Sequence, residues 1–226
     1  MIRAVAFDLD GTLIDTAPDL GDAANAMLNL LGRKPLREDR FPTFIGAGIS
    51  DFVAKVLAAD VVSTALNPAL LAGAEALFRK LYAQRLFERS RVYPGVRNTL
   101  HSLKESGFSL CCITNKESPF TLRLLAAADL HSFFHLTLCA DLIEDRKPSP
   151  NLLVAACAQL EIAPEHLLYV GDARSDIIAA RAAGCRVAAV TYGYHKQRAL
   201  DELHPDETID NIAEIGAPRF ASCASA

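Results

Sequence analysis

The chain has 226 residues, of which 51% are hydrophobic and 22% are charged, and its formal net charge at pH 7 is -4. This composition is typical of a globular protein with one large domain or two modest ones. The negative charge gives no basic field for nucleic acid or for an anionic membrane, so we expect neither partner. No apolar run reaches the roughly 18–20 residues of a membrane span, and no basic-then-apolar leader opens the sequence, which predicts a cytoplasmic protein.

The first dozen residues predict a buried strand that ends at a tight turn. An apolar run ends at Phe7, and Asp8-Leu9-Asp10-Gly11-Thr12 follows it. Side chains alternate along a strand, so Asp8 and Asp10 are expected to lean the same way. Two carboxylates at a strand end repel each other and resist burial, and a hard divalent cation such as Mg²⁺ would relieve that repulsion. The alternative is structural, with Asp8 as a helix cap and Asp10 as a turn residue.

Residues 16–90 predict an all-helical segment inserted after this strand. Apolar residues recur at helical spacing over residues 20–31, 52–57 and 70–81, and Asn67-Pro68 opens the third of these helices. Pro94-Gly95 marks the return to the main domain. We therefore expect residues 1–15 and 91–226 to form a catalytic core, and residues 16–90 to form a separate helical domain.

The rest of the chain alternates predicted helices with predicted strands. Apolar strands are expected over residues 108–113, 136–140, 167–170 and 187–190, with amphipathic helices between them. Strands that are apolar throughout indicate a parallel sheet covered on both faces, which is an α/β, Rossmann-like fold. In such sheets ligands bind outside the carboxyl ends of the strands.

Polar residues follow the predicted strand ends. Each group alone is compatible with ordinary caps and turns, as we would expect for Thr114-Asn115, but four groups at one sheet edge favour a functional site. The loop Arg146-Lys147-Pro148 precedes the next helix. The groups at the strand ends are Asp8 with Asp10, Thr114-Asn115-Lys116, Asp141, and Gly171-Asp172 with Asp176.

This set of residues suits phosphoryl transfer. The four carboxylates of Asp8, Asp10, Asp172 and Asp176 require cations, of which Mg²⁺ would supply two charges and Lys147 a third. Asp8, nearest the sheet, is expected to attack phosphorus and form an aspartyl-phosphate. Asp10 would protonate the leaving alkoxide and then activate water. The Thr114 hydroxyl and the Asn115 amide or backbone N–H would hold the phosphoryl oxygens.

These motifs resemble, in order, the four motifs of the haloacid dehalogenase-like hydrolase superfamily, and the likeness spans residues 2 to about 195. Each motif alone is weakly specific, whereas four in order are strongly specific. The resemblance implies Asp8 as nucleophile, Asp10 as acid and base, and Mg²⁺ held by Asp8, the Asp10 carbonyl oxygen and Asp172. Asp176 would lie beside these ligands and pair with Lys147. The helical insert resembles the cap that closes over the active site in this superfamily.

Within the superfamily, three stretches resemble phosphoglycolate phosphatases: Val92-Tyr93-Pro94-Gly95, Thr114-Asn115-Lys116 and Thr191-Tyr192-Gly193-Tyr194. The resemblance implies hydrolysis of 2-phosphoglycolate or a similar small phosphorylated acid. We expect a monomer or homodimer. Alternatives are the same chemistry on a sugar phosphate, an amino-sugar phosphate or pyrophosphate. A phosphomutase or a non-enzymatic phospho-receiver module fits less well.

Substrate selectivity is expected to come from the helical insert. In Gly46-Ala47-Gly48, two glycines let the backbone approach a ligand and present N–H groups to an anion. Arg40 or Lys55 would then help to bind a substrate carboxylate. The alternative is that Gly46 and Gly48 belong to a plain helix-entry loop.

The six cysteines form no CxxC pair, and five of them fall in strand-like or helix-like runs or next to them. We expect small buried apolar residues of a reducing compartment rather than disulfides or zinc ligands. Cys223, in the tail of small residues, is expected to be an exposed free thiol.

Overall fold

The structure is a computed structural model and describes residues 1–59, 67–194 and 202–216. Its main sheet has six strands in the order β5-β4-β1-β6-β7-β8, and every neighbouring pair is parallel. The first strand therefore lies inside the sheet, between two strands that come much later in the sequence. The strands are β1 (Ala4–Phe7), β4 (Ser109–Thr114), β5 (Leu136–Cys139), β6 (Leu167–Gly171), β7 (Arg186–Val190) and β8 (Glu207–Ile209).

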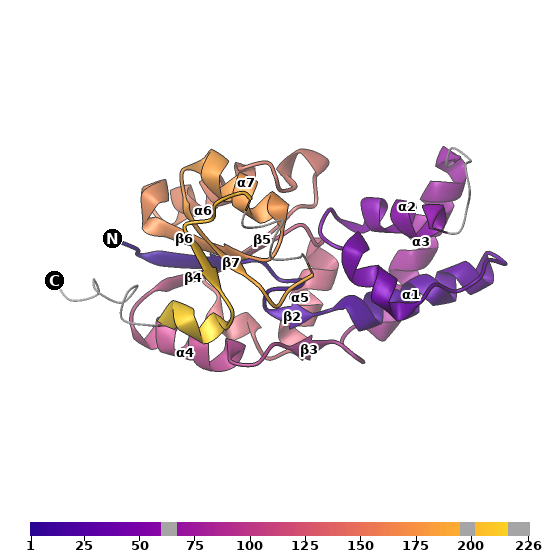
Figure 1. Cartoon of the computed structure of the whole chain (residues 1–226), viewed down its shortest axis with the longest axis horizontal. Coiled ribbons are helices and arrows are strands. Elements are labelled where there is room, and N and C mark those ends of the chain that lie inside the picture. Colours follow the sequence, from indigo (N-terminus) through magenta and orange to yellow (C-terminus); the bar gives the residue numbers. More distant parts are fainter. Residues whose placement is uncertain (60–66, 195–201, 217–226) are drawn as a thin grey trace.

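Helices cover both faces of this sheet (Figure 1), as the sequence predicts. Along β1, Val5 and Phe7 pack into one buried cluster, whereas Ala4 and Ala6 pack into another on the opposite face. The first cluster includes buried residues of α4 (Val96–Glu105) and α5 (Ser118–Ala127). The second includes buried residues of α6 (Asn151–Gln159) and α7 (Arg174–Ala183). The expected α/β, Rossmann-like fold is confirmed.

The helices of the insert lie together at one side of the molecule (Figure 1). They are α1 (Ala17–Leu30), the 3₁₀ helix η1 (Glu38–Phe44), α2 (Ile49–Ala58) and α3 (Pro68–Arg85), and they share a third buried cluster. The Asn67 side chain accepts a hydrogen bond from the Ala69 N–H and so caps α3 where the sequence places its start. Phe120 of α5 joins this cluster, with its ring 5.1 Å from that of Tyr82. The insert therefore packs directly against the sheet domain.

A small two-stranded sheet lies where the chain passes between the sheet domain and the helical insert. The sequence pattern did not predict it. Strands β2 (Ile14–Asp15) and β3 (Arg91–Val92) pair antiparallel where the chain leaves and returns. The return is also held by buried Asp19 of α1, whose carboxylate accepts hydrogen bonds from the N–H groups of Arg89 at 2.7 Å and Ser90 at 3.1 Å. Strand β8 was likewise not expected, because three residues are too few for a periodic signal.

Cys111, Cys112, Cys157 and Cys185 are buried, Cys139 is partly buried, and all five are free thiols, as predicted. Cys223 lies outside the described residues. Over the described part of the chain, no helix has the length and apolar character needed to cross a membrane.

Candidate active site

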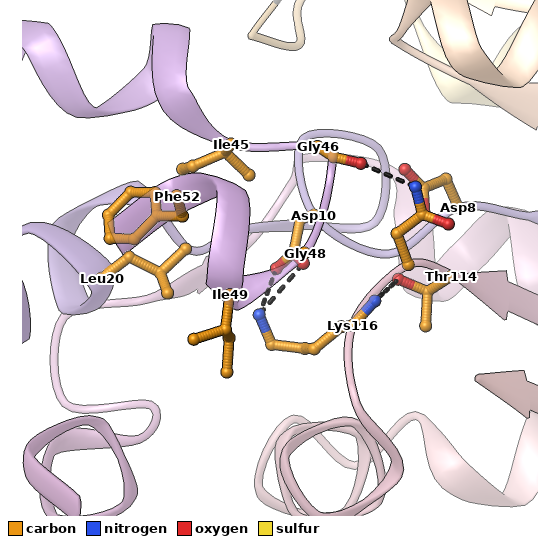
Figure 2. Close-up of a pocket in the computed structure, with 11 residues that line it drawn as sticks. Asp8, Asp10, Leu20, Ile45, Gly46, Gly48, Ile49, Phe52, Thr114 and Lys116 are labelled. Atoms are coloured by element: carbon orange, nitrogen blue, oxygen red, sulfur yellow. Dashed lines mark hydrogen bonds and ion pairs between the residues drawn. The ribbon is translucent and has the colours of Figure 1, made fainter. Parts of the chain in front are cut away.

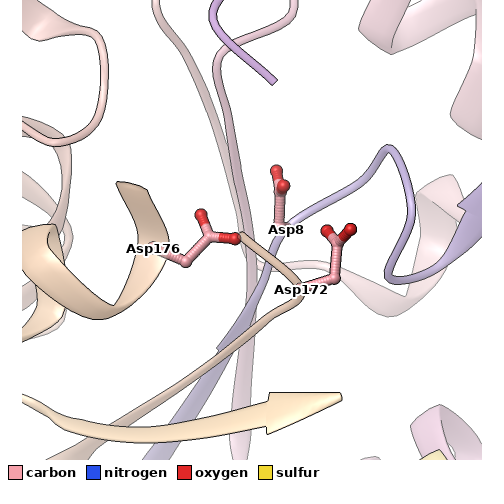
Figure 3. A group of neighbouring side chains, drawn as sticks. All are labelled: Asp8, Asp172 and Asp176. Atoms are coloured by element: carbon pink, nitrogen blue, oxygen red, sulfur yellow. The ribbon is translucent and has the colours of Figure 1, made fainter. Parts of the chain in front are cut away.

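Three buried aspartates meet at the carboxyl edge of the sheet (Figure 3). Asp8 follows β1, Asp172 follows β6, and Asp176 lies in the first turn of α7. One carboxylate oxygen from each lies within 4.8 Å of the others. Three carboxylates this close, with side chains nearly inaccessible to water, repel one another unless cations lie among them.

Lys147 supplies one of those cations. Its ammonium nitrogen lies 2.8 Å from Asp8 Oδ1 and 2.7 Å from Asp176 Oδ1, and it donates a hydrogen bond of 2.7 Å to the Tyr169 hydroxyl. Burial opposes the charge on Lys147, but the Asp176 and Asp8 carboxylates outweigh it and raise the lysine pKa, so the ammonium stays protonated. The contact between Lys147 and Asp176 is the one that the sequence predicts.

Even with Lys147 in place, the charge on Asp8 is not fully compensated. Burial raises the pKa of Asp8 to about 6; the Lys147 ammonium opposes this rise, and the Asp176 carboxylate adds to it. A nucleophilic carboxylate must be ionised. A further cation beside Asp8 would therefore favour its reactive form.

Asp172 is fixed by close packing and by two hydrogen bonds. The Thr12 hydroxyl donates to Oδ1 at 3.2 Å, and the Tyr194 backbone N–H donates to Oδ2 at 2.7 Å. Gly11, at φ +85°, lies so close that a Cβ atom there would be 2.5 Å from Asp172 Oδ2. The turn after β1 therefore needs glycine for both its backbone angle and this approach.

The Asp10 carboxylate is not a member of the aspartate cluster. It is bound by the Lys116 ammonium at 2.9 and 3.0 Å, and by the Thr16 hydroxyl, which donates to Oδ1 at 2.5 Å. Lys116 is buried, with its ammonium 5.0 Å from the centre of the Tyr82 ring. Asp8 and Asp10 nevertheless line the same pocket. Regular strand geometry ends at Phe7, and Asp10 has its own lysine partner.

Lys116 changes the charge balance derived from the sequence, which counted Lys147 as the sole lysine. Among the described residues, the four aspartates carry four negative charges and the two lysines carry two positive charges, which leaves two negative charges within this set. A divalent cation would neutralise them. The donor set of carboxylate oxygens is the kind that Mg²⁺ prefers, so these residues fit that ion.

A pocket opens above this edge, between the sheet and the helical insert (Figure 2). Its two sides differ sharply in polarity. The sheet side presents charged and polar groups, whereas the insert presents mainly apolar side chains and two glycines. The lining residues are Asp8, Asp10, Thr114, Asn115 and Lys116 from the sheet domain, and Leu20, Ile45, Gly46, Gly48, Ile49 and Phe52 from the insert.

Asn115 joins two loops at this pocket. Its side-chain NH₂ group donates to the Gly46 carbonyl at 2.8 Å and to the Lys147 carbonyl at 3.0 Å, and its side-chain oxygen accepts from the Lys147 N–H at 2.8 Å. The side-chain amide is thus already engaged in the structure. The phosphate contact that the sequence predicts for Asn115 would come from its main chain, beside the hydroxyl of Thr114.

Residues 5–190 match the family model described as haloacid dehalogenase-like hydrolase. The chain belongs to this family. A phosphoglycolate phosphatase of Nitrosospira multiformis is 43% identical to this hydrolase, over 94% of this chain and 93% of the relative. One from Thiobacillus denitrificans is 42% identical with the same coverage. A crystal structure of a predicted phosphoglycolate phosphatase from Haemophilus somnus 129pt has a TM-score of 0.89 and 30% identity, and the match covers 95% of this chain and 96% of that one.

Arg40 and Lys55, which were expected to help bind a substrate carboxylate, do not line the pocket of this haloacid dehalogenase-like hydrolase. Arg40 lies over the Phe44 ring at 5.7 Å, and Lys55 pairs with Asp51 at 2.6 Å. Arg146 is not a lining residue either, but its guanidinium lies against Gly48, which does line the pocket. A Cβ atom at Gly48 would be 3.0 Å from Arg146 Cζ. Arg146 Nε is buried and has no hydrogen-bond partner among the described residues. Sequence reasoning noted Arg146 only as a neighbour of Lys147.

Proposed function

We propose that this protein is a Mg²⁺-dependent phosphomonoester hydrolase that works through an aspartyl-phosphate on Asp8, with 2-phosphoglycolate as its substrate. The observation that carries the proposal is the position of Asp8, which is buried at the pocket floor between Lys147 and Asp172. Family membership and the phosphoglycolate phosphatases among the relatives support the reaction class and the substrate.

In the proposed first step, an Asp8 carboxylate oxygen attacks phosphorus, and the bond from phosphorus to the ester oxygen breaks. Lys147 neutralises charge on Asp8 and on the incoming phosphate. Asp10, which lines the same pocket, donates a proton to the leaving alkoxide, and Lys116 and Thr16 hold its carboxylate in place.

In the second step Asp10 takes a proton from water, which attacks phosphorus, releases inorganic phosphate and restores the Asp8 carboxylate. Asp8, Asp172 and the Asp10 carbonyl oxygen would hold Mg²⁺, which neutralises the two remaining charges and polarises the phosphoryl group. Asp176 would keep Lys147 oriented without binding the metal.

Residues 16–90 would act as the cap, and residues 1–15 with 91–226 as the catalytic core. The apolar wall formed by Leu20, Ile45, Ile49 and Phe52 offers few partners for the hydroxyl groups of a sugar. The glycine loop allows close approach of a small ligand: Gly46 has φ +125° and Gly48 has φ +89°, and the Arg146 guanidinium lies against Gly48. A short phosphorylated acid suits this combination. The cytoplasmic location and the monomeric or homodimeric state stay predictions.

Hydrolysis rates over a panel of phosphorylated metabolites test the substrate. We expect 2-phosphoglycolate to show a higher kcat/KM than glucose 6-phosphate or p-nitrophenyl phosphate. If a sugar phosphate is preferred instead, the substrate assignment fails while the mechanism stands. Absence of turnover with every phosphomonoester and pyrophosphate, in the presence of Mg²⁺, would reject the hydrolase itself.

A further inference from the structure

Helix α1 begins where the chain leaves the sheet domain, and its first N–H groups need acceptors from outside the helix. The N-cap residue is Thr16, a type whose hydroxyl ordinarily accepts one of these hydrogen bonds. Here the Thr16 hydroxyl makes no such cap; it donates instead to Asp10 Oδ1 at 2.5 Å. The Thr16 hydroxyl therefore binds the Asp10 carboxylate and does not cap the helix.

Tyr194 takes over the capping role. Its hydroxyl oxygen accepts hydrogen bonds from the N–H groups of Thr16 at 2.6 Å and Ala17 at 2.9 Å, and its O–H donates to Asp15 Oδ1 at 2.9 Å. The Ala17 N–H also donates to Asp15 Oδ1 at 3.2 Å. Thr16 and Tyr194 are 178 residues apart in the sequence. One phenol group therefore ties a late loop of the chain to the junction between β2 and α1.

The other end of Tyr194 reaches the aspartate cluster. Its backbone N–H donates to Asp172 Oδ2 at 2.7 Å, and Gly193 before it packs directly against the Asp172 side chain. A single residue thus contacts Asp172 through its main chain and the start of α1 through its side chain. At that start, Thr16 holds Asp10.

We propose that Tyr194 is a positioning residue that fixes Asp10 relative to the Asp8 and Asp172 cluster by capping α1 from outside the helix. This inference rests on the proposed function, in which Asp10 must face the leaving group while Asp8 attacks. The Tyr194 hydroxyl touches no reacting atom. It acts through Thr16, which binds Asp10. Removal of the hydroxyl therefore alters the position of Asp10, whereas the main-chain contact between Tyr194 and Asp172 is retained.

Tyr194→Phe tests this directly, because it keeps the ring and the main-chain N–H. We expect kcat for 2-phosphoglycolate to fall about tenfold, in line with the loss of the acceptor of the buried Thr16 N–H, because the Ala17 N–H keeps Asp15 Oδ1 as an acceptor. The Mg²⁺ concentration for half-maximal rate should stay within about twofold of wild type, since the metal cluster keeps its contact. Amide hydrogen exchange should speed up at Thr16 and, to a smaller extent, at Ala17, which keeps Asp15 as an acceptor. This measurement needs no activity.

Tyr93→Phe is the matched control, because Tyr93 and Tyr194 line one pocket at the surface, distinct from that above the aspartates. The Tyr93 hydroxyl has no hydrogen-bond partner among the described residues, and its ring packs against Tyr192. Tyr93→Phe should leave kcat and the exchange rates at Thr16 and Ala17 unchanged. A kcat for Tyr194→Phe within twofold of wild type, or an equal loss in Tyr93→Phe, would overturn the inference. So would a lowered thermal midpoint accompanied by a normal kcat, which indicates a purely structural role.

A double-variant cycle adds an independent check. Thr16→Val removes the bond to Asp10 but keeps the Thr16 N–H that Tyr194 accepts. If Tyr194 acts through Thr16, the double variant should lose little more activity than the worse single variant. If the fold-loss of the double variant equals the product of the two single fold-losses, Tyr194 and Thr16 act independently, and the inference is rejected. If wild type turns over no phosphomonoester, the proposed function fails, and the exchange experiment still decides whether Tyr194 caps α1.

Discussion

The two sides of the pocket differ in the side chains that form them: one is charged and polar, and the other is apolar. On the sheet side, Asp8, Asp10, Lys116 and Lys147 are buried or nearly so, and each ionic group has an opposite charge within about 3 Å. On the insert side, the apolar wall carries no charge. Buried charges are costly to unpair, whereas apolar contacts are individually weak. Changes on the sheet side should therefore stop the reaction, and changes near the insert should alter the choice of substrate.

The largest effect is expected at Asp8. In Asp8→Asn, the amide cannot act as an anionic nucleophile and is a poorer metal ligand, so turnover should fall by about 10⁴-fold or more. Phosphate release from 2-phosphoglycolate measures this loss. Asp141→Asn is the matched control, because Asp141 also follows a strand end but is exposed and accepts a hydrogen bond from the Ser118 N–H of α5. Substantial turnover by Asp8→Asn would remove the basis of the mechanism.

Asp10→Asn should be severely impaired, by about 10²- to 10⁴-fold, which is the range for loss of a general acid or base. Because Asp8 is still present, the variant should accumulate the aspartyl-phosphate that wild type turns over. Acid quenching after mixing with ³²P-labelled substrate would trap the labelled protein. Labelling equal to that of Asp8→Asn would show that Asp10 is needed before the phosphoryl group is transferred.

Metal exchange probes the aspartate cluster without mutation. Chelation should abolish activity, and added Mg²⁺ should restore it. Ca²⁺ should compete with Mg²⁺ and inhibit, because it accepts more ligands and looser angles and so can take both oxygens of Asp8. Steady-state rates over a grid of the two ions would show this. Equal rates with either ion would mean that geometry at Asp8 does not limit the reaction.

The smallest effect is expected beside the insert. Arg146→Gln should lower kcat/KM for 2-phosphoglycolate by about 10- to 100-fold, as expected for one lost bond to a carboxylate, and should leave ethyl phosphate almost unaffected. Ethyl phosphate has a methyl group in place of the carboxylate, so the ratio of the two substrates isolates this contact. Arg40→Gln, an exposed arginine of the insert, serves as control. An equal loss on both substrates would make Arg146 a general support for Lys147 instead.

The sequence revealed the sheet and the aspartates because both leave periodic or ordered signals. Runs of apolar residues locate β4, β5, β6 and β7 within one or two residues, and polar groups at their ends identify Asp172, Asp176 and Lys147 as neighbours. Because ligands bind at the carboxyl ends of parallel strands, the polar residues at those ends could be predicted to form one site. The contact between Lys147 and Asp176 was implied by the family resemblance alone.

The partners of Asp10 could not be predicted in the same way. Lys116 stands beside Asn115 in the sequence, but which of the two binds a carboxylate depends on loop geometry that no periodicity encodes. Tyr194 was noted as part of a family-like stretch, and its hydroxyl caps a helix far away in the sequence. The choice among Arg40, Lys55 and Arg146 likewise depends on how the insert packs. Contacts between distant loops are where sequence reasoning was incomplete.

The central position of β1 has a consequence for synthesis of the chain on the ribosome. Its neighbours β4 and β6 end at residues 114 and 171, and Thr12 is separated from its partner Asp172 by 160 residues. The N-terminal aspartates therefore emerge long before the residues that pair with them, and they stay hydrated in the nascent chain. A chain released before residue 172 carries Asp8 without Asp172 or Asp176. We therefore expect ribosome-bound or truncated forms of this protein to lack phosphatase activity until most of the sequence has been translated.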